Sequence, residues 1–360
     1  MARQQAALRL ALAATLGLVW GTMAREPLPG LTAVLAAQIL VGMPRPPRLG
    51  QAAALVAVIA VTGGVTFAVA STFADRLLIL MAALGVLFFV GFAMRERAAP
   101  RPSLPATMLL NTTAVVPVLT FQANVLGAGV VETLVTGAAR AILVVWLLHA
   151  LLPAPQEGTG APAGAAPATG MPVTKHRGTM RTLAKVAIVL PAEFFYLILP
   201  SALAFPALLG LVTFLSAQDS AAGRAQLVVL LLGNLIGSIA AAVAAAVFEV
   251  GPPLPALTLM ALLGSLGFAG WIMTQGRRPG GAVALTGLVT FLMLFGLSAS
   301  PTSFEVPVLD RIADIAVLSL YTIGATELFL PPPAPRWPAA VAARSADGAR
   351  TGHDSRKASS

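Results

Sequence analysis

Five ionisable side chains lie in stretches of sequence that are otherwise apolar enough to sit in a membrane. They are Arg140, Glu193, Arg311, Asp314 and, closer to the end of its stretch, Glu132. A charge at the centre of a bilayer costs about 2.5 to 3.5 kcal/mol on insertion scales, so each needs a partner, a water-filled cavity or a place near the interface. A buried arginine attracts carboxylates, and a buried carboxyl can take up a proton. The chemistry that these residue types offer is therefore binding of an organic anion coupled to proton uptake.

The first predicted pair joins Arg140 with Asp314. When the sixth and twelfth apolar stretches are superimposed on Ala141 and Ala316, Asp314 falls one residue from the position of Arg140. If those two helices face one another, the cation would attract a carboxylate substrate. Protonation of Asp314 or Glu193 would then free that arginine and couple proton entry to release of the anion. The alternative is a fixed ion pair that only sets the register of the helices.

Structural explanations stay open for the other charged residues. Arg311 would be a partner of Asp314 one turn away, or its side chain would extend to the interface. Glu193 would contact Lys185 through water or reach the outer interface. Glu132 is expected to be exposed.

A polar step interrupts the fifth apolar stretch just before Pro117. It consists of Asn111, Thr112 and Thr113. Proline removes a backbone donor, and neighbouring hydroxyls and amides often bind the carbonyl that this frees. These three residues therefore either bind the carbonyl that Pro117 frees or line part of a solute path. Further amides would join such a path or act as contacts between helices: Gln38, Gln122, Asn124 and Asn234.

Composition excludes several other kinds of chemistry. The chain has no cysteine and three scattered histidines, so we expect no disulfide and no metal site. It has no phosphate-binding loop, nucleophile elbow or His/Glu metal motif, so we expect no enzyme and no cofactor. The net charge of +9 comes from short clusters between apolar stretches, without interleaved aromatic residues. This pattern indicates membrane topology rather than binding of nucleic acid.

Apolar stretches predict an all-α polytopic membrane protein with about 12 transmembrane helices, most of them near the roughly 20 residues that cross a bilayer. Hydrophobic residues make up 57% of the chain and charged residues 10%, against about a quarter charged in soluble domains. The expected spans lie near 6–24, 31–43, 51–73, 77–94, 104–121, 130–152, 182–199, 203–218, 226–248, 255–273, 282–299 and 307–330. The first is expected to be a retained helix rather than a signal peptide. The second is short, which leaves open whether it fully crosses.

Two parallel six-helix repeats are predicted from charge and from internal similarity. With the N-terminus inside, 19 of the 23 Lys and Arg residues fall on the cytoplasmic side, which places both termini in the cytoplasm of a bacterial inner-membrane protein. Residues 80–94 and 259–273 agree at nine of fifteen positions. The predicted order is a first membrane repeat (1–152), a flexible cytoplasmic linker (153–178), a second membrane repeat (179–331) and a disordered cytoplasmic tail (332–360).

Glycines in these stretches fall on spacings typical of close helix packing. They are Gly63, Gly64, Gly85, Gly91, Gly264 and Gly270. We expect them to be helix contacts without a chemical role. A solute path commonly runs between two such repeats.

The order of features resembles the fusaric-acid-resistance and aromatic-acid-exporter superfamily. The similar segments are ALRLALAATLGLVWGTMAREPLPGLTAVLAAQIL, LLNTTAVVPVLTFQ and LDRIADIAVLSLY. With only a short linker between the halves, the chain looks like a compact branch without the large cytosolic domain. The resemblance implies efflux of aromatic or other lipophilic organic acids, driven by the proton gradient. It also implies a periplasmic membrane-fusion adaptor as partner, and leaves open a homo-oligomer.

Other functions fit the same architecture. A passive organic-anion channel would have these helices without coupling to protons. A membrane-embedded lipid-modifying enzyme would need acid, base or metal ligands clustered near one interface, whereas the charges here are dispersed. A purely structural membrane partner is a further alternative.

Overall fold

The protein is helical throughout the residues that its structure, a computed structural model, describes. These are residues 2–43, 45–98, 103–122, 129–152, 175–199, 204–217, 223–247, 253–276 and 278–298, with helical pieces between 317 and 329. The helices are α1 (Ala2–Met23), α2 (Gly30–Gly42), α3 (Leu49–Thr72), α4 (Leu77–Ala98), α5 (Leu104–Gln122), α6 (Gly129–Leu151), α7 (Lys175–Ile198), α8 (Ala204–Ala217), α9 (Gly223–Ala246), α10 (Leu254–Gln275) and α11 (Pro279–Ser298). Each matches one of the first eleven expected spans. The twelfth lies largely outside the described residues.

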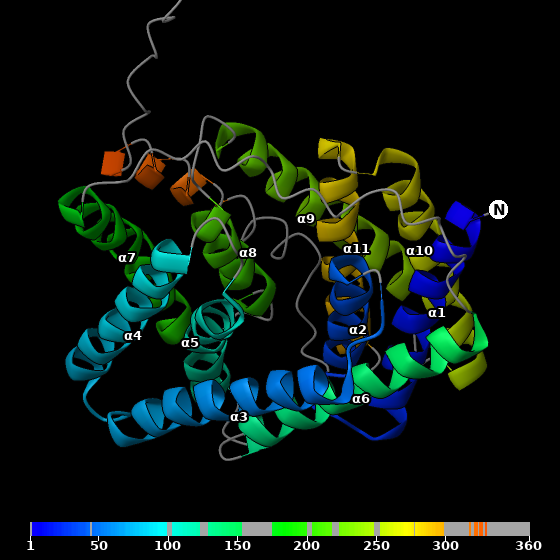
Figure 1. Ribbon diagram of the computed structural model, residues 1–360, viewed down its shortest axis with the longest axis horizontal. Coiled ribbons are helices and arrows are strands. Elements are labelled where there is room, and N and C mark those ends of the chain that lie inside the picture. Colours follow the sequence, from blue (N-terminus) through cyan, green and yellow to red (C-terminus); the bar gives the residue numbers. More distant parts are fainter. Residues whose placement is uncertain are drawn as a thin grey trace, which may run out of the picture.

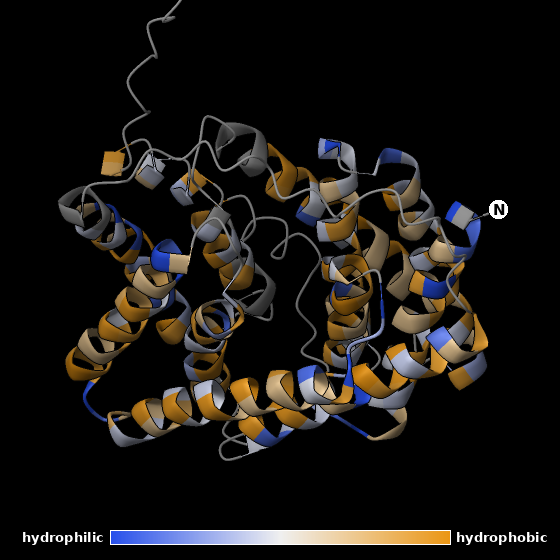
Figure 2. Ribbon diagram, viewed as in Figure 1, coloured by the Kyte–Doolittle hydropathy of each residue, from blue (hydrophilic) through white to orange (hydrophobic). Residues whose placement is uncertain are grey.

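Eight of the described helices are long and apolar enough to cross a membrane. They are α1, α3, α4, α5, α6, α9, α10 and α11. Their outward faces carry large apolar side chains such as Val61 and Leu78, which are 65% and 84% exposed. Figure 2 shows hydrophilic residues gathered at helix ends and connections, with hydrophobic residues along the helices. The chain is therefore a multi-pass membrane protein.

Two helix boundaries bear on the predictions. Helix α2 has 13 residues and is about 20 Å long, short of the roughly 30 Å hydrocarbon core, so the predicted short second helix is confirmed. Helix α7 begins at Lys175, so residues 175–178, which we expected to belong to the flexible linker, are helical.

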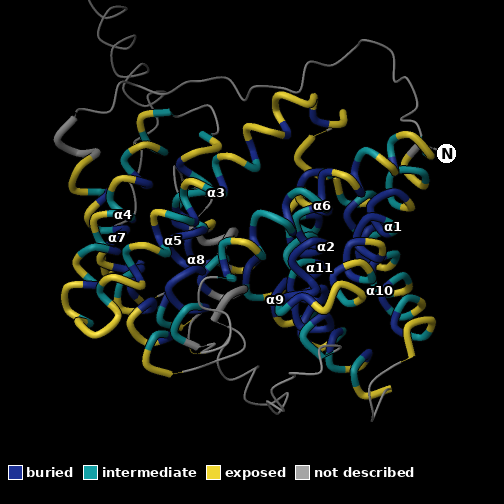
Figure 3. Tube along the Cα trace, turned by 90° about the horizontal axis from the view of Figure 1, so that it is seen from below, coloured by how far each residue is buried: buried dark blue, intermediate teal, exposed yellow. Residues whose placement is uncertain are grey.

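The helices form two groups that lie side by side (Figures 1 and 3). Bundle one contains α1, α2, α6, α9, α10 and α11, and bundle two contains α3, α4, α5, α7 and α8. Each bundle therefore mixes helices from the two halves of the sequence. In Figure 3 the buried residues are concentrated where the helices of a group meet. Helices α3 and α5 contribute buried residues to both of the apolar cores, so they join the bundles.

Helix pairs in bundle one have counterparts in bundle two. Helix α1 packs on α10, and α7 packs on α4. Helix α9 packs on α11, as α3 packs on α5, and α2 packs on α11, as α8 packs on α5. In every case each helix of one pair corresponds to the helix of the other pair whose number is higher or lower by six.

Close packing explains most of the glycines expected at helix contacts. A Cβ would lie within 4 Å of a neighbouring side chain at Gly63, Gly85, Gly91 and Gly264. At Gly64 and Gly270 a Cβ would meet nothing within 4 Å in the part of the chain that the structure describes. These two glycines thus make no helix contact there.

Candidate solute site between the two bundles

A cavity lies where bundle one meets bundle two. Its space is about 510 Å³, part of it open to the surroundings. The lining residues are Leu31, Val34, Leu35 and Gln38 of α2, Ile59 of α3, Met108, Asn111, Thr112 and Val115 of α5, Leu134 of α6 and Leu209 of α8. Sites for small molecules are typically largely apolar and carry a few polar groups that orient the ligand.

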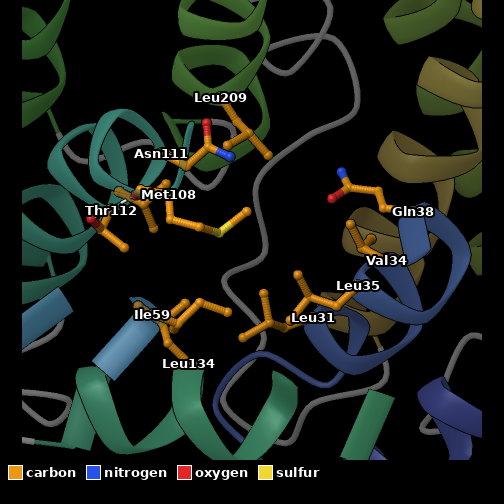
Figure 4. Close-up of a pocket in the computed structure, with 11 residues that line it drawn as sticks. Leu31, Val34, Leu35, Gln38, Ile59, Met108, Asn111, Thr112, Leu134 and Leu209 are labelled. Carbon is orange, nitrogen blue, oxygen red and sulfur yellow. Dashed lines mark hydrogen bonds between the residues drawn. The ribbon is translucent and has the colours of Figure 1, made fainter. Parts of the chain in front are cut away.

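Two amides provide the polar groups of this cavity. Gln38 and Asn111 point toward one another from opposite walls, with the side chain of Met108 close to Asn111 (Figure 4). The hydroxyl of Thr112 donates a hydrogen bond to the carbonyl of Met108 at 2.9 Å, so its proton is used within its own helix. An amide both donates and accepts hydrogen bonds, which suits it to a carboxylate or a hydroxyl.

The structure brings together some of the predicted path residues but not all. Gln38, Asn111 and Thr112 share the cavity although α2 and α5 are far apart in the sequence. Thr113 is fully buried and is not part of the lining. Gln122 ends α5, and its side chain, like Asn124, lies outside the described residues.

Arg140 forms an ion pair with Glu26, in the turn between α1 and α2. The Glu26 side chain is 6% exposed and that of Arg140 is 26% exposed. Thr32 of α2 also donates a hydrogen bond to Oε2 of Glu26, at 3.5 Å. Arg311 and Asp314, the other members of the predicted cluster, lie outside the described residues. Glu26 is a residue that the sequence analysis missed.

Small residues let this turn pack inside the protein. A side chain on Gly21 would overlap the turn itself, and one on Gly30 would overlap the α11 backbone at Leu292. Arg25 has a left-handed backbone with φ of 52°, which folds the chain back sharply after α1. The turn is therefore held against α1 and α11, and the carboxyl of Glu26 is buried with it.

The ion pair lies behind one wall of the cavity. Thr32 follows the lining residue Leu31, and a Cβ on Gly137 of α6 would lie near both. Gly137 is halfway between Leu134, which lines the cavity, and Arg140. Six helical residues span about 9 Å, so Arg140 is within two turns of the cavity wall.

A second buried ion pair joins α7 to α4 in bundle two. Nζ of Lys185 lies 3.1 Å from Oε1 of Glu96, and the hydroxyl of Thr182 donates to Oε2 at 2.8 Å. Lys185 is 2% exposed, and its ammonium lies 5.7 Å from the ring centre of Phe92. We expected Lys185 at a cytoplasmic end or in water-mediated contact with Glu193; its described acidic partner is Glu96.

Glu193 is fully buried in α7, two residues beyond a helix-interior proline, Pro191. Neither carboxyl oxygen has a hydrogen-bond partner among the residues that the structure describes. Burying an ionised carboxylate without a partner costs far more free energy than burying the neutral acid. The surroundings of Glu193 therefore suit a carboxyl that holds a proton.

Two further candidates have surroundings that argue against a role in the path. Glu132 is exposed in the first turn of α6, as expected. Oδ1 of Asn234 accepts a hydrogen bond from Thr290 at 2.6 Å, which joins α9 to α11. The amide of Asn234 is thus a contact between helices, which is the alternative that the sequence left open.

Comparison with known proteins found no matching family model, no matching curated protein and no matching solved structure. The resemblance to the exporter superfamily therefore stays a prediction from short motifs.

Proposed function

We propose that this protein exports aromatic or other lipophilic organic acids across the bacterial inner membrane, driven by the proton gradient. The observation that carries the proposal is the cavity between the bundles, with aliphatic walls and two facing amides. Those walls suit a ring or alkyl body, and the amide protons of Gln38 and Asn111 suit a carboxylate.

Arg140 supplies the charge that selects an anion. In the described state its guanidinium is neutralised by Glu26. Protonation of Glu26 would weaken this pair and leave Arg140 free to attract a substrate carboxylate behind the cavity wall. Binding of the acid would then depend on the protonation of Glu26, and Glu193, a buried carboxyl without a described partner, is the group that we propose exchanges the proton during export.

The fold proposed for this function is two parallel six-helix repeats. The support is that helix pairs recur with numbers shifted by six, α1 on α10 with α7 on α4 and α9 on α11 with α3 on α5. Residues 80–94 and 259–273, in α4 and α10, also agree at nine of fifteen positions. Rocking of one bundle against the other would open the cavity to each side in turn.

The orientation proposed has both termini in the cytoplasm, on the strength of the Lys and Arg distribution. A periplasmic membrane-fusion adaptor would then receive the exported acid. A reporter enzyme that is active only in the periplasm, fused to the C-terminus, should be inactive in intact cells. Activity of this fusion would show that the C-terminus is outside.

Transport by the purified protein tests the proposal. The full chain is reconstituted in liposomes loaded with radiolabelled benzoate or a larger aromatic acid, and efflux is measured with and without a pH gradient. We expect efflux that the gradient accelerates and that Met108→Trp, which fills the cavity, abolishes. Flux that follows voltage and ignores the pH gradient would identify an anion channel instead. No flux of any tested acid would contradict transport of this class.

A further inference from the structure

A second cavity lies where the ends of α1, α2 and α10 meet, away from the seam between the bundles. It has about 270 Å³ of space, part of it open to the surroundings. Its lining residues are Ala6, Arg9, Leu10, Leu40, Val41 and Met273. Arg9 is the charged residue of this set, and the other five are apolar.

Among the residues that the structure describes, Arg9 is buried without an acidic partner. The residue is 7% exposed, and Nη2 donates a hydrogen bond to the carbonyl of Leu152 at 2.5 Å. Its Nε has no hydrogen-bond partner, and no carboxylate forms an ion pair with it in the part of the chain that the structure describes. A carbonyl satisfies one donor but leaves the positive charge uncompensated, and an uncompensated buried charge is costly.

Bundle two shows what such a cation ordinarily has as its partner. There α7 packs on α4, and Lys185 of α7 meets Glu96 of α4. In bundle one α1 packs on α10, whose sequence matches that of α4. Continuing this match by two residues aligns Glu96 with Gln275, which carries no charge. The cation is present on α1, whereas the carboxylate on the facing helix is not.

We propose that the missing negative charge is the phosphate of an anionic phospholipid. The guanidinium of Arg9 has Nε free, and arginine binds phosphate oxygens through charge-assisted hydrogen bonds. Leu40, Val41 and Met273 form an apolar wall beside it, along which an acyl chain or the glycerol backbone packs. Val41 is 38% exposed on the outer surface of a membrane helix bundle, so the cavity is reachable from the lipid. Basic pockets between transmembrane helices bind anionic headgroups in this way.

Native mass spectrometry of the purified full chain in detergent measures the binding. Phosphatidylglycerol is titrated against phosphatidylcholine with the same acyl chains, and glycerol 3-phosphate serves as the headgroup without chains. Arg9→Gln removes the charge, Val41→Trp fills the cavity with the charge kept, and Arg3→Gln removes an exposed charge from the same helix as the matched control. Gel filtration and thermal unfolding establish that each variant is folded.

One tightly bound phosphatidylglycerol is expected, retained about tenfold or more over phosphatidylcholine, since a charge-assisted contact contributes about 1.5 to 3 kcal/mol. Arg9→Gln and Val41→Trp should both lose that preference, and Arg3→Gln should keep it. If Arg9→Gln does not fold, the lipid preference of Val41→Trp alone tests the site. Equal retention of the two lipids by the natural chain, or a Val41→Trp variant that binds as the natural chain does, overturns the site. Binding of glycerol 3-phosphate as tight as that of the lipid overturns the assignment to phospholipid.

Discussion

Arg140 of α6 is ion-paired with Glu26, which lies in the turn between α1 and α2. Helices α2 and α6 both line the cavity between the bundles, so this pair fixes two of its walls relative to each other. Thr32 of α2 adds a hydrogen bond to the same carboxylate. Any event that neutralises Glu26 therefore loosens the cavity wall and releases a cation beside it.

Removing one partner of this ion pair should destabilise the fold more than removing both. Glu26→Gln leaves Arg140 with an uncompensated charge, for which we expect a loss of about 3 kcal/mol in the free energy of unfolding. The double variant Glu26→Gln with Arg140→Gln should recover part of the loss. Denaturant unfolding in micelles of Glu26→Gln, of Arg140→Gln and of the double variant, each compared with the natural chain, completes a double-mutant cycle. Additive losses would show that the two side chains do not interact.

Substitutions of two amide residues should have different effects, one on transport of the solute and the other on the stability of the fold. Asn111→Leu changes a cavity wall, so we expect weaker transport of the acid with an unfolding midpoint close to that of the natural chain. Asn234→Leu leaves Thr290 without its buried acceptor, so we expect a loss of about 1 to 3 kcal/mol in stability and unchanged transport per folded molecule. The reverse pattern would move the solute path from α5 to the α9–α11 contact.

Glu193 should carry the proton dependence of transport. Glu193→Gln keeps the shape of the side chain and removes its ionisable proton, and its burial without a partner means that no described contact is lost. We expect a folded protein whose acid efflux no longer responds to a pH gradient. The matched control is Glu132→Gln, which changes an exposed carboxylate on α6. Gradient-driven efflux that survives in Glu193→Gln would exclude this residue from coupling.

Helices α9 and α11 should tolerate no added bulk at their crossing. A Cβ on Gly237 would overlap the α11 backbone at Gly287 and the side chain of Thr290, so Gly237→Ala should cost about 1 to 3 kcal/mol. Gly270→Ala adds a methyl where no described atom lies within 4 Å. Because alanine favours helix over glycine, that change should be neutral or stabilise by up to about 1 kcal/mol. Similar unfolding midpoints for the two variants would contradict the close packing of α9 on α11.

Helix positions were predictable because membrane crossing is a local property of the sequence. A charge-free stretch such as 51–73 must form a helix of that length wherever it lies, and α3 does so. The shortness of α2 was equally visible, since prolines stand on both sides of it. Gln38, Asn111 and Thr112 were found as polar residues in apolar stretches, a signal that needs no knowledge of neighbours.

Pairing of charges was not predictable, because it depends on which helices become neighbours. Glu26 lies between the first two predicted spans, and nothing in the sequence identifies Arg140 as its partner. Lys185 was expected at a cytoplasmic helix end, yet the packing of α7 on α4 buries it against Glu96. The sequence likewise does not predict that Arg9 has no acid beside it among the described residues.

Chemical labelling tests most directly whether the cavity between the bundles is a water-accessible solute path. The chain contains no cysteine, so single substitutions at Gln38 and Asn111 can be labelled without background. We predict that Gln38→Cys and Asn111→Cys react with a charged, membrane-impermeant thiol reagent and that an aromatic acid slows the reaction. Val61→Cys, on the exposed apolar face of α3, should stay unlabelled in the bilayer. Unreactive cysteines at both cavity positions, or labelling that no acid slows, would contradict a solute path between the bundles.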